Sequence, residues 1–249
     1  MTFTIAIAGK GGVGKSTIAA LLVRVLHERT PEVVLAVDAD PNSNLGEKLG
    51  VSVERTIGDL REELLGKADE LPAGASKHDI VRYNIQMAKV EGSGFDLITM
   101  GRPEGPGCYC YINNILRTFL DELVEDYRYV VIDNEAGMEH LSRRTTRRMD
   151  LLVVVADATK VGIETAVRLL NLAAEMKIHI SRTMMIVNRV RRELPRQLRD
   201  IADKGRFDEM VVIPHDETIE EMSLSGRPLM ELDRLNATYL SVLSIAGRL

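Results

Sequence analysis

The chain carries the stretch Gly9-Lys10-Gly11-Gly12-Val13-Gly14-Lys15-Ser16-Thr17 between the apolar run Thr4–Ala8 and a helical pattern over Thr17–Glu28. This order of strand, glycine-rich turn and helix is what the pattern G-x-x-x-x-G-K-[ST] requires of a phosphate-binding loop, or P-loop. Its glycines let the backbone curl so that successive N–H groups and the helix N-terminus point at a polyphosphate. Lys15 would reach the β- and γ-phosphates, and Ser16 would bind Mg²⁺. The sequence therefore predicts a nucleotide site built from Gly9 and residues 11–17.

A second lysine, Lys10, follows the first glycine of this loop. It is not needed to cradle phosphate, and from its position it cannot easily curl back onto the phosphates that its own backbone surrounds. In this position it resembles the signature lysine of the deviant P-loop ATPases, the family of septum-site and partition ATPases, the nitrogenase iron protein and the arsenite-pump ATPase. The resemblance implies that Lys10 crosses a dimer interface and stabilises charge at the partner's nucleotide. A solvated loop lysine is the alternative.

The hydrophobic pattern predicts the fold. Short apolar runs recur along the chain with helical stretches between them: Thr4–Ala8, Val33–Val37, Phe95–Met100, Tyr129–Ile132, Leu151–Val155, Thr183–Val187 and Met210–Ile213. Continuous rather than alternating hydrophobicity is typical of strands buried on both faces, so we expect an α/β fold with a doubly wound, mostly parallel sheet flanked by helices. With 249 residues, 45% of them hydrophobic, the chain fits one P-loop domain over residues 1–249.

Other segments give weaker predictions. The alternation over Tyr83–Val90 suggests an extra edge strand or a hairpin partner of Phe95–Met100. An amphipathic helix followed by a loop is expected within Glu54–Ser76, a helix over Asn113–Glu125, and a covering helix within Asp233–Leu249.

Charge and composition argue against several classes of function. The net charge of −5 gives the whole surface no strong attraction to DNA or anionic lipid. The longest apolar stretch, Leu151–Ala156, is far shorter than the ~20 residues that span a bilayer, and Met1 leads directly into a predicted core strand rather than a signal peptide. Two cysteines are too few for a disulfide framework. We expect a cytoplasmic protein that binds neither nucleic acid nor membrane.

Acidic residues end two of the predicted strands, where open α/β sheets bind their ligands. Asp133 ends an apolar strand in the arrangement that holds the water shell of Mg²⁺, and Gly137 follows it in a stretch that resembles a second switch, where a glycine lets a backbone N–H approach the γ-phosphate. Asp38 and Asp40 lie in a turn that resembles the family's first switch. The resemblance implies that Asp40 orients or activates the attacking water, with Asp38 as an outer partner of the metal. Helix capping is the alternative for all three aspartates.

Asn188 ends another predicted strand. Its amide can donate to and accept from a purine edge, and its position matches the base-binding asparagine of the deviant P-loop family. Guanine-specific P-loop proteins would continue N-K-x-D, whereas this chain continues Asn188-Arg189-Val190-Arg191. We therefore expect an adenine nucleotide, ATP or ADP, with a turn residue as the alternative for Asn188.

Cys108 and Cys110 lie two positions apart, just before the predicted helix over Asn113–Glu125. Thiols near a helix N-terminus form thiolates more readily, and the thiolate is the form that binds metal. Thiolate metal sites usually have four ligands, so a two-fold dimer would complete the site by bringing two C-x-C pairs together at its axis. Two small buried side chains are the alternative.

Four features together resemble the nickel-insertion ATPases that mature carbon monoxide dehydrogenase: Lys10, the DADPNSNLG turn over Asp38–Gly46, the GPGCYC stretch over Gly105–Cys110, and the EAGMEHLSRRT run over Glu135–Thr145. The resemblance covers nearly the whole chain. It implies an ATP-dependent homodimer in which Cys108 and Cys110 of both chains hold one Ni²⁺ or Zn²⁺, and it implies carbon monoxide dehydrogenase or a related nickel enzyme as the client.

Two other functions remain open from the sequence. One is a positioning or partition switch, against which the cysteine pair and the lack of a basic or membrane-seeking tail both argue. The other is an iron–sulfur ATPase of the iron-protein type, whose two cysteines per chain are widely separated, unlike a C-x-C pair.

Overall fold

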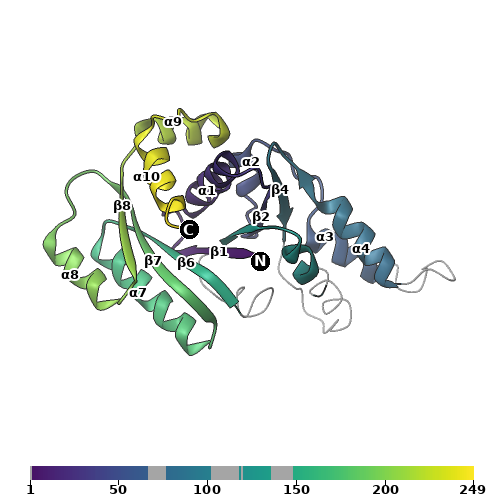
Figure 1. The fold of residues 1–249 in the computed structure, drawn as a ribbon, viewed down its shortest axis with the longest axis horizontal. Helices are drawn as coiled ribbons and strands as arrows, with labels where there is room; N and C mark the ends of the chain where they lie inside the picture. The colour runs from purple at the N-terminus through teal and green to yellow at the C-terminus, as the bar shows by residue number, and fades with distance from the viewer. Residues whose placement is uncertain (1, 67–76, 102–117, 119, 136–147) are drawn as a thin grey trace.

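The computed structural model describes residues 2–66, 77–101, 118, 120–135 and 148–249 (Figure 1). Its eight-stranded sheet has the order β3-β4-β2-β5-β1-β6-β7-β8. Only the edge pair β3 and β4 is antiparallel. The strands are β1 Phe3–Gly9, β2 Val34–Ala39, β3 Val90–Glu91, β4 Phe95–Thr99, β5 Tyr129–Asn134, β6 Arg148–Asp157, β7 His179–Val190 and β8 Glu209–Pro214.

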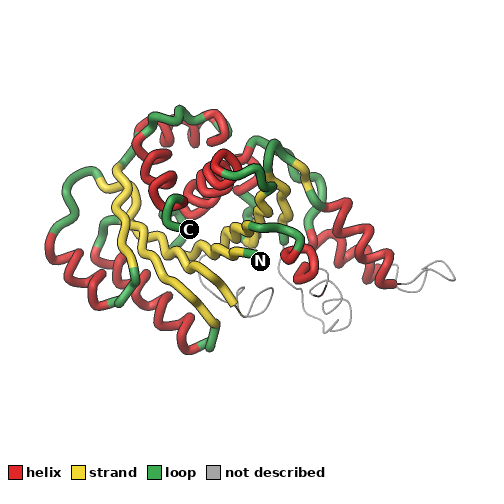
Figure 2. Tube along the Cα trace, viewed as in Figure 1, coloured by secondary structure: helices red, strands yellow, loops and turns green. Residues whose placement is uncertain are grey.

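Helices cover both faces of this sheet (Figure 2). They are α1 Lys15–Arg29, α2 Leu45–Leu49, α3 Ile57–Gly66, α4 Lys77–Ala88, α7 Lys160–Glu175, α8 Arg196–Lys204, α9 Glu217–Ser225, the 3-10 helix η1 Leu229–Glu231 and α10 Ala237–Ala246, and residues 120–125 are also helical. In Figure 1, α7 and α8 lie on one side of β6–β8, while α1, α9 and α10 lie on the other. The predicted doubly wound, mostly parallel α/β sheet is therefore confirmed.

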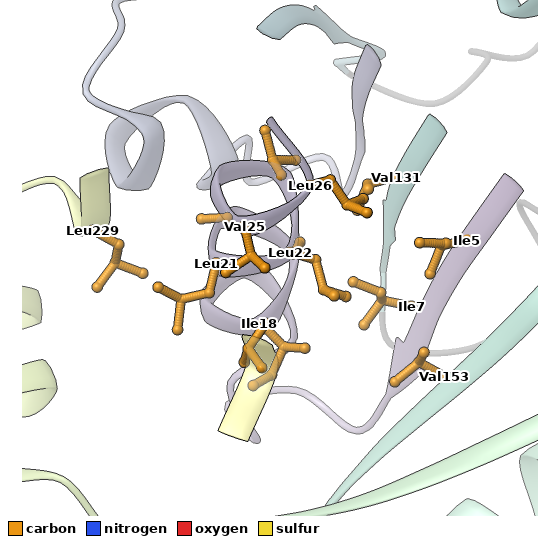
Figure 3. Packing of buried hydrophobic residues seen from close by; sticks show 14 of the residues in the cluster. Ile5, Ile7, Ile18, Leu21, Leu22, Val25, Leu26, Val131, Val153 and Leu229 are labelled. Carbon is orange, nitrogen blue, oxygen red and sulfur yellow. The ribbon is translucent and has the colours of Figure 1, made fainter. Parts of the chain in front are cut away.

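Strand β1 explains why the apolar runs are continuous. Ile5 and Ile7 pack against α1 on one face, as Figure 3 shows, while Ala6 and Ala8 belong to the cluster on the opposite face. Because successive side chains of a strand point to opposite faces, a strand covered on both sides must be apolar at every position. All seven predicted runs are strands.

One prediction is wrong. Residues 83–88 of the expected edge strand belong to α4, and only Val90–Glu91 pair antiparallel with β4. The buried residues Val81, Ile85 and Ala88 recur at helical spacing, and this period begins before the segment in which alternation suggested a strand. The helices predicted within Glu54–Ser76 and Asp233–Leu249 are present as α3 and α10. Of the helix predicted over Asn113–Glu125, residues 118 and 120–125 are helical, and the others lie outside the described residues.

A polar cluster fastens α1 to the C-terminal segment. The buried Arg24 donates to the carbonyl oxygens of Leu229 (2.9 Å) and Leu232 (2.6 Å) and to Glu28 (2.8 Å). Its guanidinium also lies 4.9 Å from the centre of the Tyr239 ring, whose hydroxyl donates to Glu28. Helix α1, which begins with the P-loop, is therefore fixed at its far end by a buried charged group.

We expect Arg24→Met to lower the free energy of unfolding by roughly 1–3 kcal/mol, because the substitution removes a buried donor from two carbonyl oxygens and from the carboxylate of Glu28. Arg234 pairs with the same Glu28 at 3.3 Å but is 71% exposed, so Arg234→Met should cost less than about 1 kcal/mol. The chain has no tryptophan, so urea unfolding followed by circular dichroism is the measurement. Equal losses in the two variants would contradict the argument.

Candidate functional site

The P-loop is pressed against the sheet at both ends and open in its middle. Gly9 has φ 149° and Gly14 has φ 98°, a region that favours glycine. A Cβ at Gly9 would collide with the carbonyl oxygen of Val155, and one at Gly14 with the side-chain amide of Asn188. At Gly11 no atom lies within 4 Å of such a Cβ. The open middle is where a phosphate chain would lie.

The two lysines of the loop face different ways. Lys15 is 6% exposed, and its Nζ lies 3.4 Å from the carbonyl oxygen of Lys10, so its side chain turns back over the loop. The side chain of Lys10 is exposed. This arrangement agrees with the different roles predicted for them, since only Lys15 turns toward its own loop.

The predicted first switch is organised by its own carboxylates. Asp38 is fully buried and accepts hydrogen bonds from the N–H groups of Asp40 (3.1 Å) and Leu45 (2.9 Å), the latter at the start of α2. Burial raises the pKa of Asp38 to about 6, although these two N–H groups lower it. Asp40 accepts from the backbone N–H (2.9 Å) and side-chain amide (2.8 Å) of Asn42. The carboxylate of Asp38 thus closes the turn that leads into α2, whose N-cap is Asn44, and its role as an outer partner of the metal stays a prediction.

Asp133 is a buried carboxylate without an ordinary partner. It lies opposite Asp38 in the pairing of β2 with β5, and neither of its oxygens accepts a hydrogen bond of normal geometry from the described residues. Burial, helped by the charges of Asp38 and Asp40, raises its pKa to about 7, although the Ser16 hydroxyl and the Lys15 ammonium lower it. An uncompensated buried carboxylate beside a hydroxyl fits a divalent cation. Ser16 and Asp133 therefore suit Mg²⁺.

Asn188 lies against the P-loop. Its side-chain NH₂ donates to the carbonyl oxygen of Val13 at 2.9 Å, and its Oδ1 accepts from the backbone N–H of Arg189 at 2.9 Å. The Arg189 guanidinium donates to the carbonyl oxygen of Gly12 at 3.0 Å. Contact of Asn188 with a base stays a prediction, because its amide already has protein partners. Nothing in the sequence indicated the contact made by Arg189.

A pocket of about 350 Å³ opens beside these residues. It is lined by Thr17, Asn188, Arg189, Arg191, Pro214, His215, Asp216, Ile219, Glu220, Ser223, Leu224 and Thr238. It adjoins the P-loop through Thr17 and Asn188, which makes it the candidate base pocket. The sequence indicated this pocket through Asn188, but not through the residues of α9 and α10 that also line it.

The carboxylate of Asp216 in this pocket already accepts three hydrogen bonds. It accepts from the backbone N–H of Ile219 (3.2 Å), the amide of Asn236 (2.7 Å) and the hydroxyl of Thr238 (3.2 Å). A guanine would need a carboxylate for its two N–H donors, and Asp216 could serve only by giving up its helix cap. The carboxylate of Glu220 also lines the pocket, so adenine is favoured by the missing N-K-x-D motif rather than by the pocket.

Lys48, on α2, is a further cation at the site that the sequence did not indicate. Burial lowers its pKa, and so does the nearby charge of Arg189, while Glu47 and Asp133 raise it. Its ammonium is therefore within electrostatic reach of both the carboxylate of Asp133 and the guanidinium of Arg189.

Three predicted site residues, Gly137, Cys108 and Cys110, lie outside the described residues. Within the part of the chain that the structure describes, no three His, Cys, Asp or Glu side chains are grouped so as to hold a metal ion. None of the described helices is long and apolar enough to cross a bilayer.

Comparison with known proteins agrees with this geometry. Residues 4–229 match the family described as the CobQ/CobB/MinD/ParA nucleotide binding domain. An uncharacterized ATP-binding protein of Methanocaldococcus jannaschii is 45% identical over 98% of this chain and 97% of its own length. The carbon monoxide dehydrogenase accessory protein CooC of Rhodospirillum rubrum is 33% identical over 98% of this chain and 97% of its own. The septum site-determining protein MinD of Pyrococcus horikoshii, solved with Mg-ADP, shares the fold with a TM-score of 0.68 at 20% identity, covering 100% of this chain and 96% of that one.

The buried Asp133 should make stability depend on pH. Its folded pKa of about 7 lies above the ordinary 3.8, so in chelator and without nucleotide its contribution to stability is full below pH 3.8 and is lost as pH rises to about 7. Asp133→Asn should therefore be more stable than the wild type at pH 8, by roughly 2–4 kcal/mol, and the two should converge near pH 4. Urea unfolding at a series of pH values tests this, with the exposed Asp126→Asn as the control. A constant difference between wild type and Asp133→Asn at every pH would refute it.

Proposed function

We propose, from the premise that the chain belongs to the CobQ/CobB/MinD/ParA family of nucleotide-binding proteins, that it is a dimerising ATPase that delivers nickel to carbon monoxide dehydrogenase or a related nickel enzyme. ATP hydrolysis is the activity of this family of P-loop ATPases, and the chain is an ATPase. The nickel function rests on one observation, the Cys108-Tyr109-Cys110 pair within a chain that also resembles the R. rubrum accessory protein along almost its whole length.

In this proposal the described residues would carry the parts of the hydrolysis reaction. The ammonium of Lys15 would leave the Lys10 carbonyl for the β- and γ-phosphates, which are stronger acceptors. Ser16 and Asp133 would hold Mg²⁺, which neutralises charge on the phosphates when bound. Asp40, held by Asn42 next to this carboxylate cluster, would orient the attacking water.

Lys10 would act on the nucleotide of a second copy of the chain. Its exposure supports this role, because a side chain that leaves its own loop is available to cross an interface. A cation supplied by the partner makes hydrolysis depend on dimer formation, as an arginine finger does. ATP would thus control the dimer, and the dimer would control hydrolysis.

Nickel is the cargo in this proposal rather than a resident cofactor. Cys108 and Cys110 supply two thiolates, so two chains supply the four that a closed thiolate site needs. Zn²⁺ would compete, since thiolates do not sort the two metals by affinity alone. A dimer that changes with nucleotide would change the distance between the two cysteine pairs, which links metal release to hydrolysis. In the same proposal, residues 1–249 form one domain that acts in the cytoplasm and binds neither nucleic acid nor membrane.

The two P-loop lysines should have separable effects. Lys15→Ala should abolish ATP binding, because it removes the cation that touches phosphates in its own chain. Lys10→Ala should leave ATP affinity near that of the wild type but remove hydrolysis and ATP-dependent dimerisation. Calorimetry gives the affinity, and analytical ultracentrifugation with and without ATP gives the dimer. An equal loss of affinity in both variants would show that Lys10 acts in cis.

The metal test follows from ligand counting. We expect one tightly bound Ni²⁺ or Zn²⁺ per dimer, and metal should promote dimerisation even without ATP. The double variant Cys108→Ser, Cys110→Ser should lose tight metal binding and keep its ATP affinity, which serves as the control for folding. Calorimetric metal titration alongside sedimentation measures both. One tight ion per monomer, or unchanged metal affinity in the double variant, would refute the shared site.

The identity of the client enzyme is tested by a separate activation assay. The nickel-loaded wild type with ATP should activate nickel-free carbon monoxide dehydrogenase, while the cysteine double variant should not. If the dimer shares a metal but does not activate the enzyme, the shared metal site stands and carbon monoxide dehydrogenase is not the client.

A further inference from the structure

The end of β7 departs from regular strand geometry beside the P-loop. The register of β7 against β8 shifts between Val187 and Val190, and Arg189 has φ 56°, in the left-handed region that non-glycine residues rarely adopt. In a regular strand, successive side chains point to opposite faces. Here Asn188 and Arg189 follow one another, yet both reach the same loop. The local distortion is what allows this.

The two side chains hold two consecutive carbonyls of the P-loop. Asn188 donates to the carbonyl oxygen of Val13, and Arg189 to that of Gly12. In a trans peptide the C=O of one residue and the N–H of the next point in opposite directions. Drawing the Gly12 carbonyl toward β7 therefore turns the N–H of Val13 away from β7, and fixing the Val13 carbonyl does the same for the N–H of Gly14.

We propose that Arg189 is a positioning residue for the phosphates of ATP, which acts by holding the Gly12 carbonyl so that the next N–H faces the phosphate chain. Loop N–H groups bind phosphate only when several of them converge, and the glycines that let this backbone curl also leave it free to turn elsewhere. Contacts from outside the loop remove that freedom before the ligand arrives. A glycine at 189 would avoid the left-handed strain, so the arginine retains a side-chain contact at a cost in backbone energy.

Arg189 also links the two halves of the site. It lines the candidate base pocket, while its guanidinium holds the loop that would bind the phosphates. Its charge is near enough to Lys48 to help lower the pKa of that ammonium, so two cations lie close together at the site. The inference rests only on nucleotide binding at the P-loop and is independent of the nickel cargo.

The experiment compares ATP with inorganic tripolyphosphate, which has the phosphates but no base. Arg189→Met should weaken the binding of both ligands, in Mg²⁺ and by calorimetry, by the same factor of about ten, as for the loss of one charge-assisted hydrogen bond. Arg189→Gly should show the same loss of affinity with no loss of melting temperature, because glycine removes the contact and the backbone strain together. Arg192→Met is the matched control: this exposed neighbour neither lines the pocket nor contacts the P-loop among the described residues, and it should bind both ligands as the wild type does.

Each other outcome overturns the inference. If ATP binding weakens and tripolyphosphate binding does not, Arg189 acts on the base or ribose. If melting temperatures fall in both variants while affinities stay unchanged, its role is structural only. An equal loss of affinity in Arg192→Met would show that the effect comes from the positive charge of the surface and not from the contact with Gly12. A wild type that binds neither ligand would refute nucleotide binding itself, which is a failure of the proposed function and distinct from the first three.

Discussion

Burial of the central strands on both faces is the constraint on which the site depends. Strands β1, β2 and β5 are apolar at almost every position, so polar groups can gather only where these strands end. The strands are parallel and neighbouring, hence their carboxyl ends meet at one edge. Asp38 and Asp133 are direct partners across β2 and β5, and the P-loop follows the adjacent β1. The fold thus places the carboxylates of Asp38, Asp40 and Asp133 beside the phosphate-binding loop.

Burying these carboxylates costs electrostatic free energy. Asp38 has backbone N–H donors, whereas Asp133 has no hydrogen-bond partner of normal geometry among the described residues, and both have raised pKa values because they are buried. Lys15 and Lys48 oppose the negative charge of Asp133 from two different helices. A nucleotide with its metal would bring positive and negative charge together. The cation would pair with the carboxylates, and the phosphates would pair with the lysines. The site is therefore built for the pair of ligands rather than for either alone.

Local patterns were enough to find most of this site and the strands that carry it. The P-loop, Asp38, Asp133 and Asn188 were each found because an apolar run and the polar residue that ends it are adjacent in sequence. What the sequence did not reveal depends on contacts between distant segments. The carboxylate of Asp216 accepts a hydrogen bond from Asn236, 20 residues later. Arg189 reaches the loop only because its backbone adopts a left-handed conformation that no residue preference predicts. The start of α4 was missed because its helical period begins before the segment that alternates.

Helix α1 explains how a glycine-rich loop can hold its shape. Its sides are buried against the sheet, and Arg24 fastens its last turns to η1 and α10, so the helix has little freedom to slide or tilt. The first N–H groups of α1 therefore point at a fixed place beyond Gly14. The other side of the loop has no such helix, and it is there that Asn188 and Arg189 hold the carbonyls of Val13 and Gly12. Each half of the loop is thus fixed by a different part of the fold, and the phosphates would bind to donors that need little reorganisation.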